Sequence, residues 1–406
     1  MNISNLKITL LENTPFLRED GTFDRDRAMD FCGKIGGICY NEDGLMASFA
    51  EPDEKTQRRI QSTTSGEHQS VYEHLGITMY LKDSSKMNNM VLHSGRQYAS
   101  SERSLRYTLV KENGCNLTKR EIMLYNKWFK IFYDLINYEN ETVYKKTGDG
   151  LRPKKIETLA KENARYMCST FINTEMVHTI PFAQLNRMIR YMKDYINKEN
   201  KDEFEERLSK DFEMFIAECE RLNLSDERLQ SNRKHRKIEL FDENIESIPE
   251  CFDVTYSTNY TGSLALVAQR QRHRIDQISI ERNPSNGWFV PPLLENHPEL
   301  VKQWLEDLES VRNEVPQGEL VSIHEEGSYN NFIKFLKERD CSAPQLEIFR
   351  QANATKEKYY KALVEKEHPY AKRLEPYMGK RRCGYPDYDC PRPCGFREGI
   401  NGTRRV

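Results

Sequence analysis

Two arginine-rich clusters in this sequence could bind an anion. The first covers residues 96–107 and combines three arginines with one glutamate and several hydroxyl side chains. So many polar groups are costly in a protein core unless they meet a polar ligand. Arginine suits phosphate because its planar guanidinium donates two parallel hydrogen bonds, and serine hydroxyls can complete the site. The alternative interpretation is the exposed, polar start of a helix.

The second cluster, Gln269–Arg274, follows the apolar run Ser263–Ala268. If that run is buried, the arginines emerge directly from a core element, as a rigid site requires. The alternative is a basic surface helix. A third candidate, Arg339, follows another apolar helical segment, where a lone arginine usually complements the helix dipole.

The elements that carry these clusters indicate an internal repeat. In each half of the chain an extended segment, residues 71–81 or 251–258, precedes an arginine cluster. Alternation also predicts an edge strand near residues 6–14. Apolar residues at helical spacing predict helices, with Thr118 as the cap of the first. These helices cover about residues 119–138, 156–167, 182–197, 203–221, 258–273, 298–313 and 328–352. A charge-dense linker is expected at 222–244.

The triplet Arg272-His273-Arg274 resembles the signature of the flavin-dependent thymidylate synthases, in which Arg-His-Arg is followed after seven residues by Ser. The first cluster keeps the second half of this motif, as Arg96, seven residues and Ser104. Other segments also resemble the family along most of residues 1–358. They are LLENTP at 10–15, ICY at 38–40, GEHQSVYEHLGITMYL at 66–81, ENARYMCSTFINTEMVHT at 162–179 and NNFIKFLKERDCSAPQLEIF at 330–349.

The resemblance implies the fold and its domains. We expect an α+β protein of two tandem flavin-dependent thymidylate synthase-like units, each a mixed sheet packed with helices, followed by a short tail that contains cysteines. The first unit would cover 1–221, the linker and second, diverged unit 222–358, and the basic tail 359–406. Because the family is tetrameric, we expect a homodimer that forms a pseudo-tetramer.

The resemblance also implies roles for individual residues. The implied nucleotide-binding residues are Glu102, Ser104, Arg106, Arg165, Gln269, Arg272 and Arg339, with Ser104 and Arg339 also catalytic. The implied flavin-binding residues are His68, Ser70, Glu73, Arg272, His273 and Arg274. The first copy keeps one wall of the family's shared nucleotide site and the second copy keeps the other. We therefore infer a composite site, with the reciprocal site degenerated.

Some positions depart from the family. Its flavin-binding Asn and Arg fall at Pro181 and Ala183 in the first copy, and at Ser328 and Asn330 in the second. Ser101 replaces the Asn before Glu102, and Arg282 stands where the second copy should have Ser.

The family reaction methylates dUMP at C5, with methylenetetrahydrofolate as carbon donor, FAD as hydride carrier and NADPH as its reductant. The resemblance therefore implies dUMP methylation. The departures leave two alternatives open. One is a flavin- and folate-dependent C5 modification of another pyrimidine nucleotide, such as hydroxymethylation, and the other is a non-catalytic nucleotide- or RNA-binding homologue.

Three of the ten cysteines, Cys383, Cys390 and Cys394, cluster near the end of the chain. Neighbouring Pro and Gly residues suit a zinc-binding knuckle, because tight turns aim several sulfurs at one point. The spacing is not a standard Cys-x-x-Cys pair, and a fourth ligand would have to come from Cys341 or His368. The alternative is a tail whose thiols bind no metal.

Composition limits the remaining classes. Sixty-one Lys and Arg against sixty-three Asp and Glu give a net charge of −2, which argues against a general nucleic-acid binder. No apolar run approaches the length of about 20 residues that a membrane-spanning helix needs. The N-terminus has no apolar stretch typical of a signal peptide. A soluble, cytoplasmic protein is expected.

Overall fold

The computed structural model describes residues 5–95, 97–108, 110, 115–146, 148, 150–231, 233, 239–341, 344–390 and 405. The chain forms two compact units, each built from two separate stretches. The first unit combines Met1–Arg103 with Asn173–Glu239, and the second combines Ser104–Ile172 with Leu240–Val406.

This division differs from the sequence-based one at residues 222–239, which belong to the first unit, and at residues 104–172, which pack with the later half of the chain. The physical reason is a shared apolar core. Trp128 is buried against Trp304, with ring centroids 4.8 Å apart, and its indole N–H donates to Asp307 at 2.9 Å.

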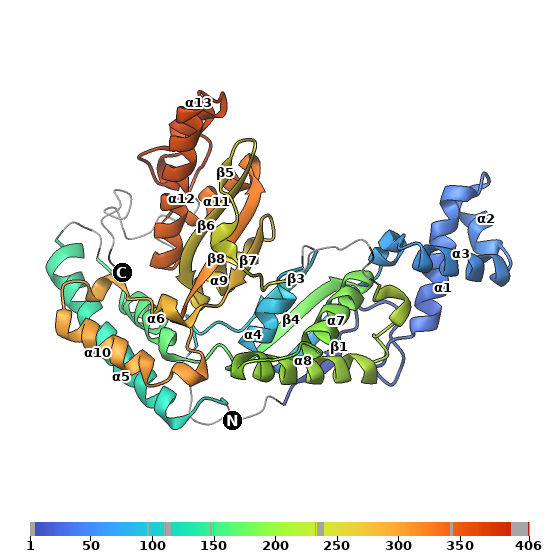
Figure 1. The fold of residues 1–406 in the computed structure, drawn as a ribbon, viewed down its shortest axis with the longest axis horizontal. Coiled ribbons are helices and arrows are strands. Elements are labelled where there is room, and N and C mark those ends of the chain that lie inside the picture. Colours follow the sequence, from blue (N-terminus) through green and yellow to red (C-terminus); the bar gives the residue numbers. More distant parts are fainter. Residues whose placement is uncertain are drawn as a thin grey trace. The chain divides into compact units, whose positions relative to one another are not determined.

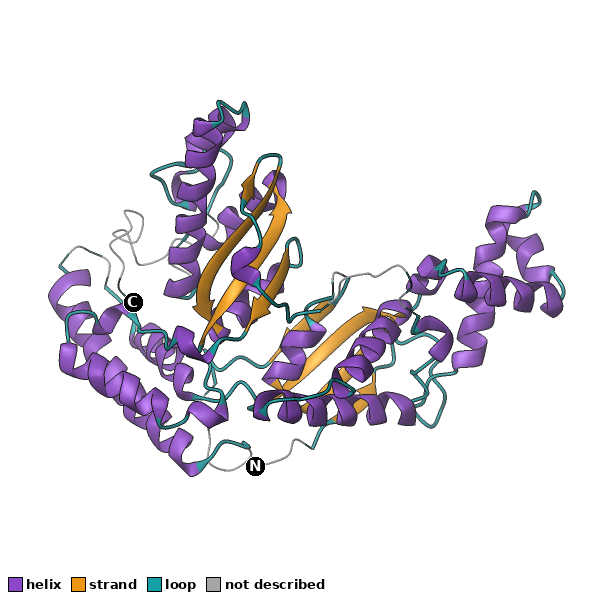
Figure 2. Ribbon diagram, in the orientation of Figure 1, coloured by secondary structure: helices purple, strands orange, loops and turns teal. Residues whose placement is uncertain are grey.

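Each unit contains one four-stranded sheet packed with helices, which confirms the α+β class (Figure 2). Every pairing between named strands is antiparallel. In strand direction the sheets therefore differ from the mixed sheets that we expected. Among the described residues, parallel pairing is limited to the single bridge between Phe241 and Ile280.

The sheet of the first unit has the strand order β1-β2-β4-β3. Its strands are β1 (Lys7–Leu10), β2 (Gly76–Ser85), β3 (Ala99–Glu102) and β4 (Asn173–Pro181). Its helices are α1 (Arg25–Gly36), α2 (Gly44–Ala50), α3 (Asp53–Ser65), α4 (Lys86–Leu92), α7 (Phe182–Ile196) and α8 (Glu203–Arg221). Within this unit, α7 and α8 lie along one face of the sheet (Figure 1).

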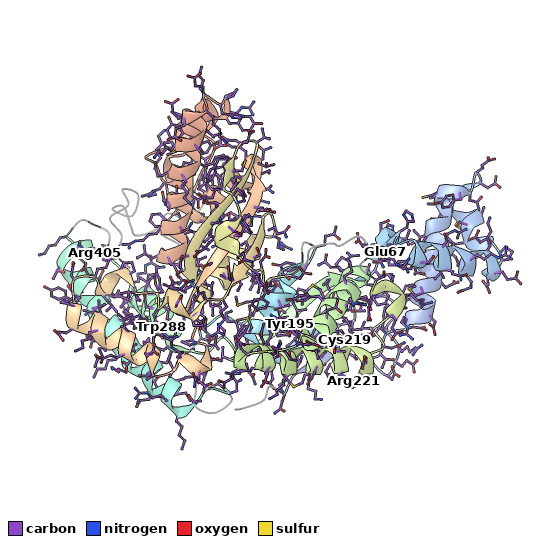
Figure 3. The ribbon with its side chains drawn as sticks, in the orientation of Figure 1. Glu67, Tyr195, Cys219, Arg221, Trp288 and Arg405 are labelled. Carbon is purple, nitrogen blue, oxygen red and sulfur yellow. The ribbon has the colours of Figure 1, made fainter. Side chains whose placement is uncertain are left out.

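The first strand is an edge strand, as the alternation predicted. Its outer backbone groups are bound by α8: the N–H of Ile8 donates to Glu218 at 2.9 Å, and Arg221 donates to the Ile8 carbonyl at 2.7 Å. Arg221, at the end of α8, is labelled in Figure 3. These bonds cover the edge, which would otherwise be open to pairing with another strand.

The sheet of the second unit has the order β5-β6-β8-β7. Its strands are β5 (Cys251–Phe252), β6 (Thr255–Ser263), β7 (Gln277–Glu281) and β8 (Leu320–Ser328). Its helices are α5 (Lys119–Glu139), α6 (Pro153–Ala164), α9 (Leu264–Arg270), α10 (Pro298–Glu309), α11 (Tyr329–Arg339), α12 (Leu346–Glu365) and α13 (Tyr370–Leu374). Helix α5 begins with the predicted Thr118 cap, completed by Glu121 as a capping box.

The two sheets share one strand order and one local detail. Ser85 ends β2 and caps α4, and Ser263 ends β6 and caps α9. Each serine hydroxyl accepts a hydrogen bond from the N–H three residues later and donates to a buried carboxylate, Asp211 or Glu347. The Arg272-His273-Arg274 triplet begins nine residues after Ser263, and Ser94-Gly95-Arg96 stands at the same distance after Ser85.

Three predicted elements have different boundaries in the structure. The helix expected at 258–273 begins only at Leu264, because residues 255–263 pair with β8. The helix expected at 328–352 is divided into α11 and α12. Residues 71–74 belong to the 3-10 helix Gln69–His74, and strand β2 begins at Gly76. In the part of the chain that the structure describes, no helix has the length and apolar character required to cross a membrane.

Candidate active site

Three of the implied site arginines belong to the second unit, and one of them, Arg106, lies close enough to each of the other two to affect its pKa. Burial is the main cause that lowers the pKa of Arg165 and of Arg339, the latter to about 10, and the positive charge of Arg106 lowers both further. Such mutual repulsion requires proximity. The structure therefore brings together arginines that come from both halves of the sequence.

Arg106 is held by a carboxylate. Its Nε donates to Glu162 at 2.5 Å, and both side chains are largely buried. Glu162 belongs to α6, which also leads to Arg165. Helix α6 and the turn after it thus orient Arg106 through Glu162 and also carry Arg165.

Arg165 is almost completely buried, with 4% of its surface exposed. Its Nη2 donates to the amide oxygen of Gln345, while its Nε has no hydrogen-bond partner among the described residues. No ion pair of the described residues includes Arg165. Arg165 is thus a buried cation whose charge and N–H groups are only partly compensated by the protein. Such burial is costly unless a ligand supplies the missing partners.

A buried hydrogen-bond chain connects Arg165 to the start of α9. Gln345 donates to the hydroxyl of Tyr166, which donates to Glu347 at 2.8 Å. Glu347 accepts from both the backbone N–H and the hydroxyl of Ser263, at 2.8 and 2.6 Å. Burial raises the pKa of the Glu347 carboxyl. This chain fixes Arg165 relative to the helix that carries Gln269.

Gln269 lies near the end of α9, and both polar atoms of its amide are buried without a hydrogen-bond partner among the described residues. A buried amide left in this state costs about 1–3 kcal/mol. An amide that offers both a donor and an acceptor is suited to a polar ligand. Gln269 and Arg165 are therefore the two implied site residues whose unsatisfied atoms most directly indicate a ligand.

The signature triplet forms the turn that follows α9. His273 donates through Nδ1 to Glu338 at 2.5 Å and accepts a hydrogen bond from Nε of Arg339 at Nε2. Burial lowers the pKa of His273 to about 4, so the imidazole is neutral at pH 7. Arg272 is half-buried, and Arg274 is exposed in the left-handed backbone region, with φ 54°.

Beneath the triplet, Arg270 anchors the turn. It donates to Glu325 at 2.9 and 2.6 Å and to Asp276 at 2.5 Å, and its guanidinium lies 3.8 Å from the centre of the Phe335 ring. Tyr256 donates to the same Glu325 at 2.5 Å. Arg270 belongs to the second cluster of candidate anion-binding residues, but its guanidinium is already paired with Glu325 and Asp276.

Glu102 belongs to the first unit, whereas Ser104 belongs to the second. The Ser104 hydroxyl accepts from the backbone N–H of Arg106 at 3.3 Å, inside the turn that leads to the second unit's helices. Glu102 ends β3 of the first unit, where Asn89 donates to it at 3.2 Å and Lys86 lies 3.5 Å away.

The other implied flavin residues, His68, Ser70 and Glu73, also belong to the first unit. His68 and Ser70 are exposed, whereas Glu73 pairs with Arg187 of α7 at 2.9 Å. The Nε of Arg187 is buried without a hydrogen-bond partner among the described residues. The implied residues thus divide between two units, and all three of the arginines Arg106, Arg165 and Arg339 belong to the second.

The positions at which the family keeps its flavin-binding Asn and Arg have local structural roles here. Pro181 ends β4, and Ala183 is buried in α7. The Ser328 hydroxyl caps α11 by accepting from the N–H of Asn331 at 3.2 Å. These positions therefore offer little for a flavin.

The zinc prediction falls partly outside the described residues, because Cys394 is not among them. Cys383 is exposed and Cys390 is half-buried. His368 lies 3.3 Å from Asp253, so this proposed ligand has another partner. Within the described residues, no group of three or more His, Cys, Asp or Glu could hold a metal.

Several residues that organise the site were not identified from the sequence. They are Glu162, Tyr166, Arg187, Ser263, Glu325 and Glu347. Glu162 and Tyr166 stand within the segment that resembles the family's Ala-Arg segment, and Glu347 stands within the closing segment. Their position in those segments was the available signal. Their pairing could not be read from the sequence because the partners of Tyr166 lie about 180 residues away.

Part of the chain is similar to a known protein family. Residues 25–199 match the family described as "Thymidylate synthase complementing protein". A similar solved structure is thymidylate synthase X from Helicobacter pylori, determined with FAD and dUMP. It is 15% identical, and the match covers 56% of this chain and 100% of that chain, with a TM-score of 0.30. No curated protein matches the sequence.

Proposed function

Because residues 25–199 of this chain carry the sequence features of the thymidylate synthase complementing proteins, we propose that the chain is a flavin-dependent enzyme of the thymidylate synthase type. Its substrate is dUMP, which it methylates at C5, with methylenetetrahydrofolate as carbon donor and NADPH as reductant. The Helicobacter pylori protein with FAD and dUMP supplies the ligand classes for this proposal.

The observation that carries the proposal is the incompletely satisfied Arg165 with Arg106 near it, and Arg106 is also near Arg339. A dry group of cations with an unsatisfied N–H favours an anionic ligand. The unsatisfied amide of Gln269 adds a donor and an acceptor on the helix that the Glu347 chain fixes. A nucleotide monophosphate offers both a dianionic phosphate and a polar base.

Each of these residues has a role in the proposed reaction. Ser104, Arg106 and Gln269 hold the phosphate, and Arg165 and Arg339 face the uracil or its phosphate. Arg339 stabilises the negative charge that builds up on the uracil as the ring polarises and C5 becomes nucleophilic. Because His273 is a neutral acceptor for Arg339, it orients this guanidinium without neutralising its charge. Preorganised charge of this kind acts strongly where water is excluded.

The residues present fit a flavin in part. Arg272 and Arg274 are cations that suit the diphosphate of FAD, whereas Pro181 and Ala183 offer no polar side chain. His68, Ser70 and Glu73 of the first unit complete the proposed flavin-binding set. When bound, FAD supplies the hydride, and the protein supplies binding and orientation.

We also propose that the two units are diverged copies of one ancestral family unit. The support is the shared strand order, β1-β2-β4-β3 and β5-β6-β8-β7, and the equal spacing from the capping serine to the triplet position. In this view each copy supplies one wall of a shared nucleotide site. The loss of Arg and His in the first copy, where Ser94 and Gly95 stand, belongs to the degenerated reciprocal site.

Three measurements test the proposed function. The visible absorption spectrum of the purified chain shows whether it retains flavin, and a colourless protein that FAD does not reconstitute argues against an enzyme of this class. Product analysis with dUMP, methylenetetrahydrofolate and NADPH then distinguishes methylation from hydroxymethylation. Arg272→Ala and Ser104→Ala should each weaken dUMP binding in calorimetry. If both variants bind like the wild type, the composite site is wrong.

Metal analysis of the purified chain tests the remaining cofactor proposal. Zinc that stays bound through gel filtration and is lost in Cys383→Ser would indicate a zinc knuckle in the tail. A metal-free protein would leave the tail as a thiol-bearing segment.

A further inference from the structure

The residue that follows Arg339 is the centre of a buried polar cluster. Asp340 is completely buried at the end of α11. One carboxylate oxygen accepts from Lys356 of α12 at 2.5 Å and from the Tyr385 hydroxyl. The other accepts from Asn353 at 2.9 Å and from Arg381 at 3.4 Å.

Two of these four donors come from the C-terminal segment, residues 375–388, which the family resemblance leaves without a role. The backbone of this segment is tied to the same place. The N–H of Arg382 donates to the Asp340 carbonyl at 2.9 Å, and Lys356 donates to the carbonyl of Lys380 at 2.9 Å. We call residues 375–388 the strap.

The strap is also fixed to helix α11. Lys337 lies 2.5 Å from Asp387, and Arg382 donates to the Lys337 carbonyl at 3.1 Å. The rings of Tyr377 and Tyr385 pack edge to face, 4.8 Å between centroids. Both the backbone and the side chains of the strap therefore bind the last turn of α11.

The cluster is an unusual way to secure a helix end. Lys356 and Asp340 are both buried, and burial lowers the pKa of Lys356. A buried ion pair adds little net stability over apolar packing, but it permits only one geometry. The residue whose geometry it fixes is adjacent to Arg339, which donates to His273 of the signature triplet.

From these contacts we infer that the strap positions Arg339 for the nucleotide by locking Asp340. Tyr385 and Arg381 are positioning residues, since they act through Asp340 and not on the ligand. This inference rests on the proposed function for the role of Arg339, whereas the locking of the α11 end is independent of it.

Hydrogen–deuterium exchange on the full chain tests the locking without any ligand. Tyr385→Phe should speed amide exchange in residues 337–341 at least tenfold, and Arg381→Gln should act in the same direction. Tyr388→Phe is the matched control, because it removes the same hydroxyl three residues further along the chain. If neither Tyr385→Phe nor Arg381→Gln changes amide exchange in residues 337–341, the inference is overturned, whether or not the chain binds dUMP.

A double-mutant cycle tests the positioning. Tyr385→Phe should weaken dUMP binding about tenfold in the wild-type background and have no effect in an Arg339→Ala background. An equal loss in both backgrounds would show a general structural effect and would refute positioning through Arg339. A wild-type chain that does not bind dUMP would contradict the proposed function, and the exchange experiment would then decide the strap alone.

Discussion

Replacement of Arg165 by methionine should cost the ligand-free protein little or no stability and at the same time remove nucleotide binding. The native guanidinium is 4% exposed, and the fold disfavours its charged form, because burial outweighs the attraction of nearby carboxylates and lowers its pKa. Methionine has a similar length, fills the same space and needs no hydration. Replacement of buried ionic groups by apolar side chains of similar volume is often neutral or stabilising, by about 1–4 kcal/mol, and Arg165 belongs to no ion pair of the described residues whose other charge would be left behind.

One loss opposes this gain. The amide oxygen of Gln345 loses the hydrogen bond from Arg165, and a bond to a charged group contributes about 1.5–3 kcal/mol. Gln345 still donates to Tyr166, so only one of its contacts is removed. The two ranges nearly cancel, so the expected net change in the free energy of unfolding lies between a loss of about 2 and a gain of about 2.5 kcal/mol.

Urea and thermal unfolding of the ligand-free variant measure the first effect, and calorimetry with dUMP measures the second. The loss of a buried charged contact should weaken dUMP binding about 30-fold or more. Arg350→Met is the control, because this arginine belongs to the same unit, pairs with Glu295 at the surface and should change stability by less than about 0.5 kcal/mol. A decrease in stability of more than about 3 kcal/mol on Arg165→Met, which is the cost of breaking a satisfied buried ion pair, or unchanged dUMP binding, would refute the reasoning.

Three further outcomes are expected. Burial raises the pKa of Asp211 from its ordinary 3.8 to about 6, so the native state binds the proton more tightly than the unfolded state, and the associated stability of about 3 kcal/mol is present below pH 4 and lost as the pH rises through 6. Asp211→Asn should therefore flatten the dependence of stability on pH in this range and raise Tm at pH 8. If urea titrations of the variant show the same pH dependence as the wild type, the assignment to Asp211 is wrong. Gln269→Leu should weaken dUMP binding about tenfold in calorimetry while leaving Tm equal or higher, because both amide atoms are already unsatisfied; a loss of stability would mean that the amide is structural. Trp128→Ala should cost about 3–5 kcal/mol in chemical denaturation, since the indole is fully buried against Trp304, and a cost below about 1 kcal/mol would show that the shared core of the second unit is misassigned.

The sequence predicted best those elements whose local signals agree with their tertiary environment. Helix α5 has both a capping box at Thr118 and an apolar stripe, and its boundaries are correct. The helix expected at 258–273 was wrong at its start because Thr258, Tyr260 and Gly262 belong to a strand paired with β8. In that segment cross-strand pairing decides the conformation, and such pairing is not visible in a single strand's sequence.

The site was predictable as a set of residue types and less so as an arrangement. Motif spacing identified Arg106, Arg165 and Arg339, and the structure places all three in one unit. Motif spacing could not show that Arg106 is neutralised by Glu162 whereas Arg165 has no such partner among the described residues. That difference arises from burial and from contacts between distant segments.

The division of each unit into two stretches has a consequence for biosynthesis. Helix α5, with Trp128 on its apolar face, leaves the ribosome roughly 180 residues before Trp304, which covers it. At about 5–20 residues per second, the nascent chain waits about 10–35 s for that partner. During this interval residues 173–239 are made and can join the first unit, so the first unit can be complete while the second remains half-built. Chaperone demand should therefore fall on the emerging α5–α6 hairpin.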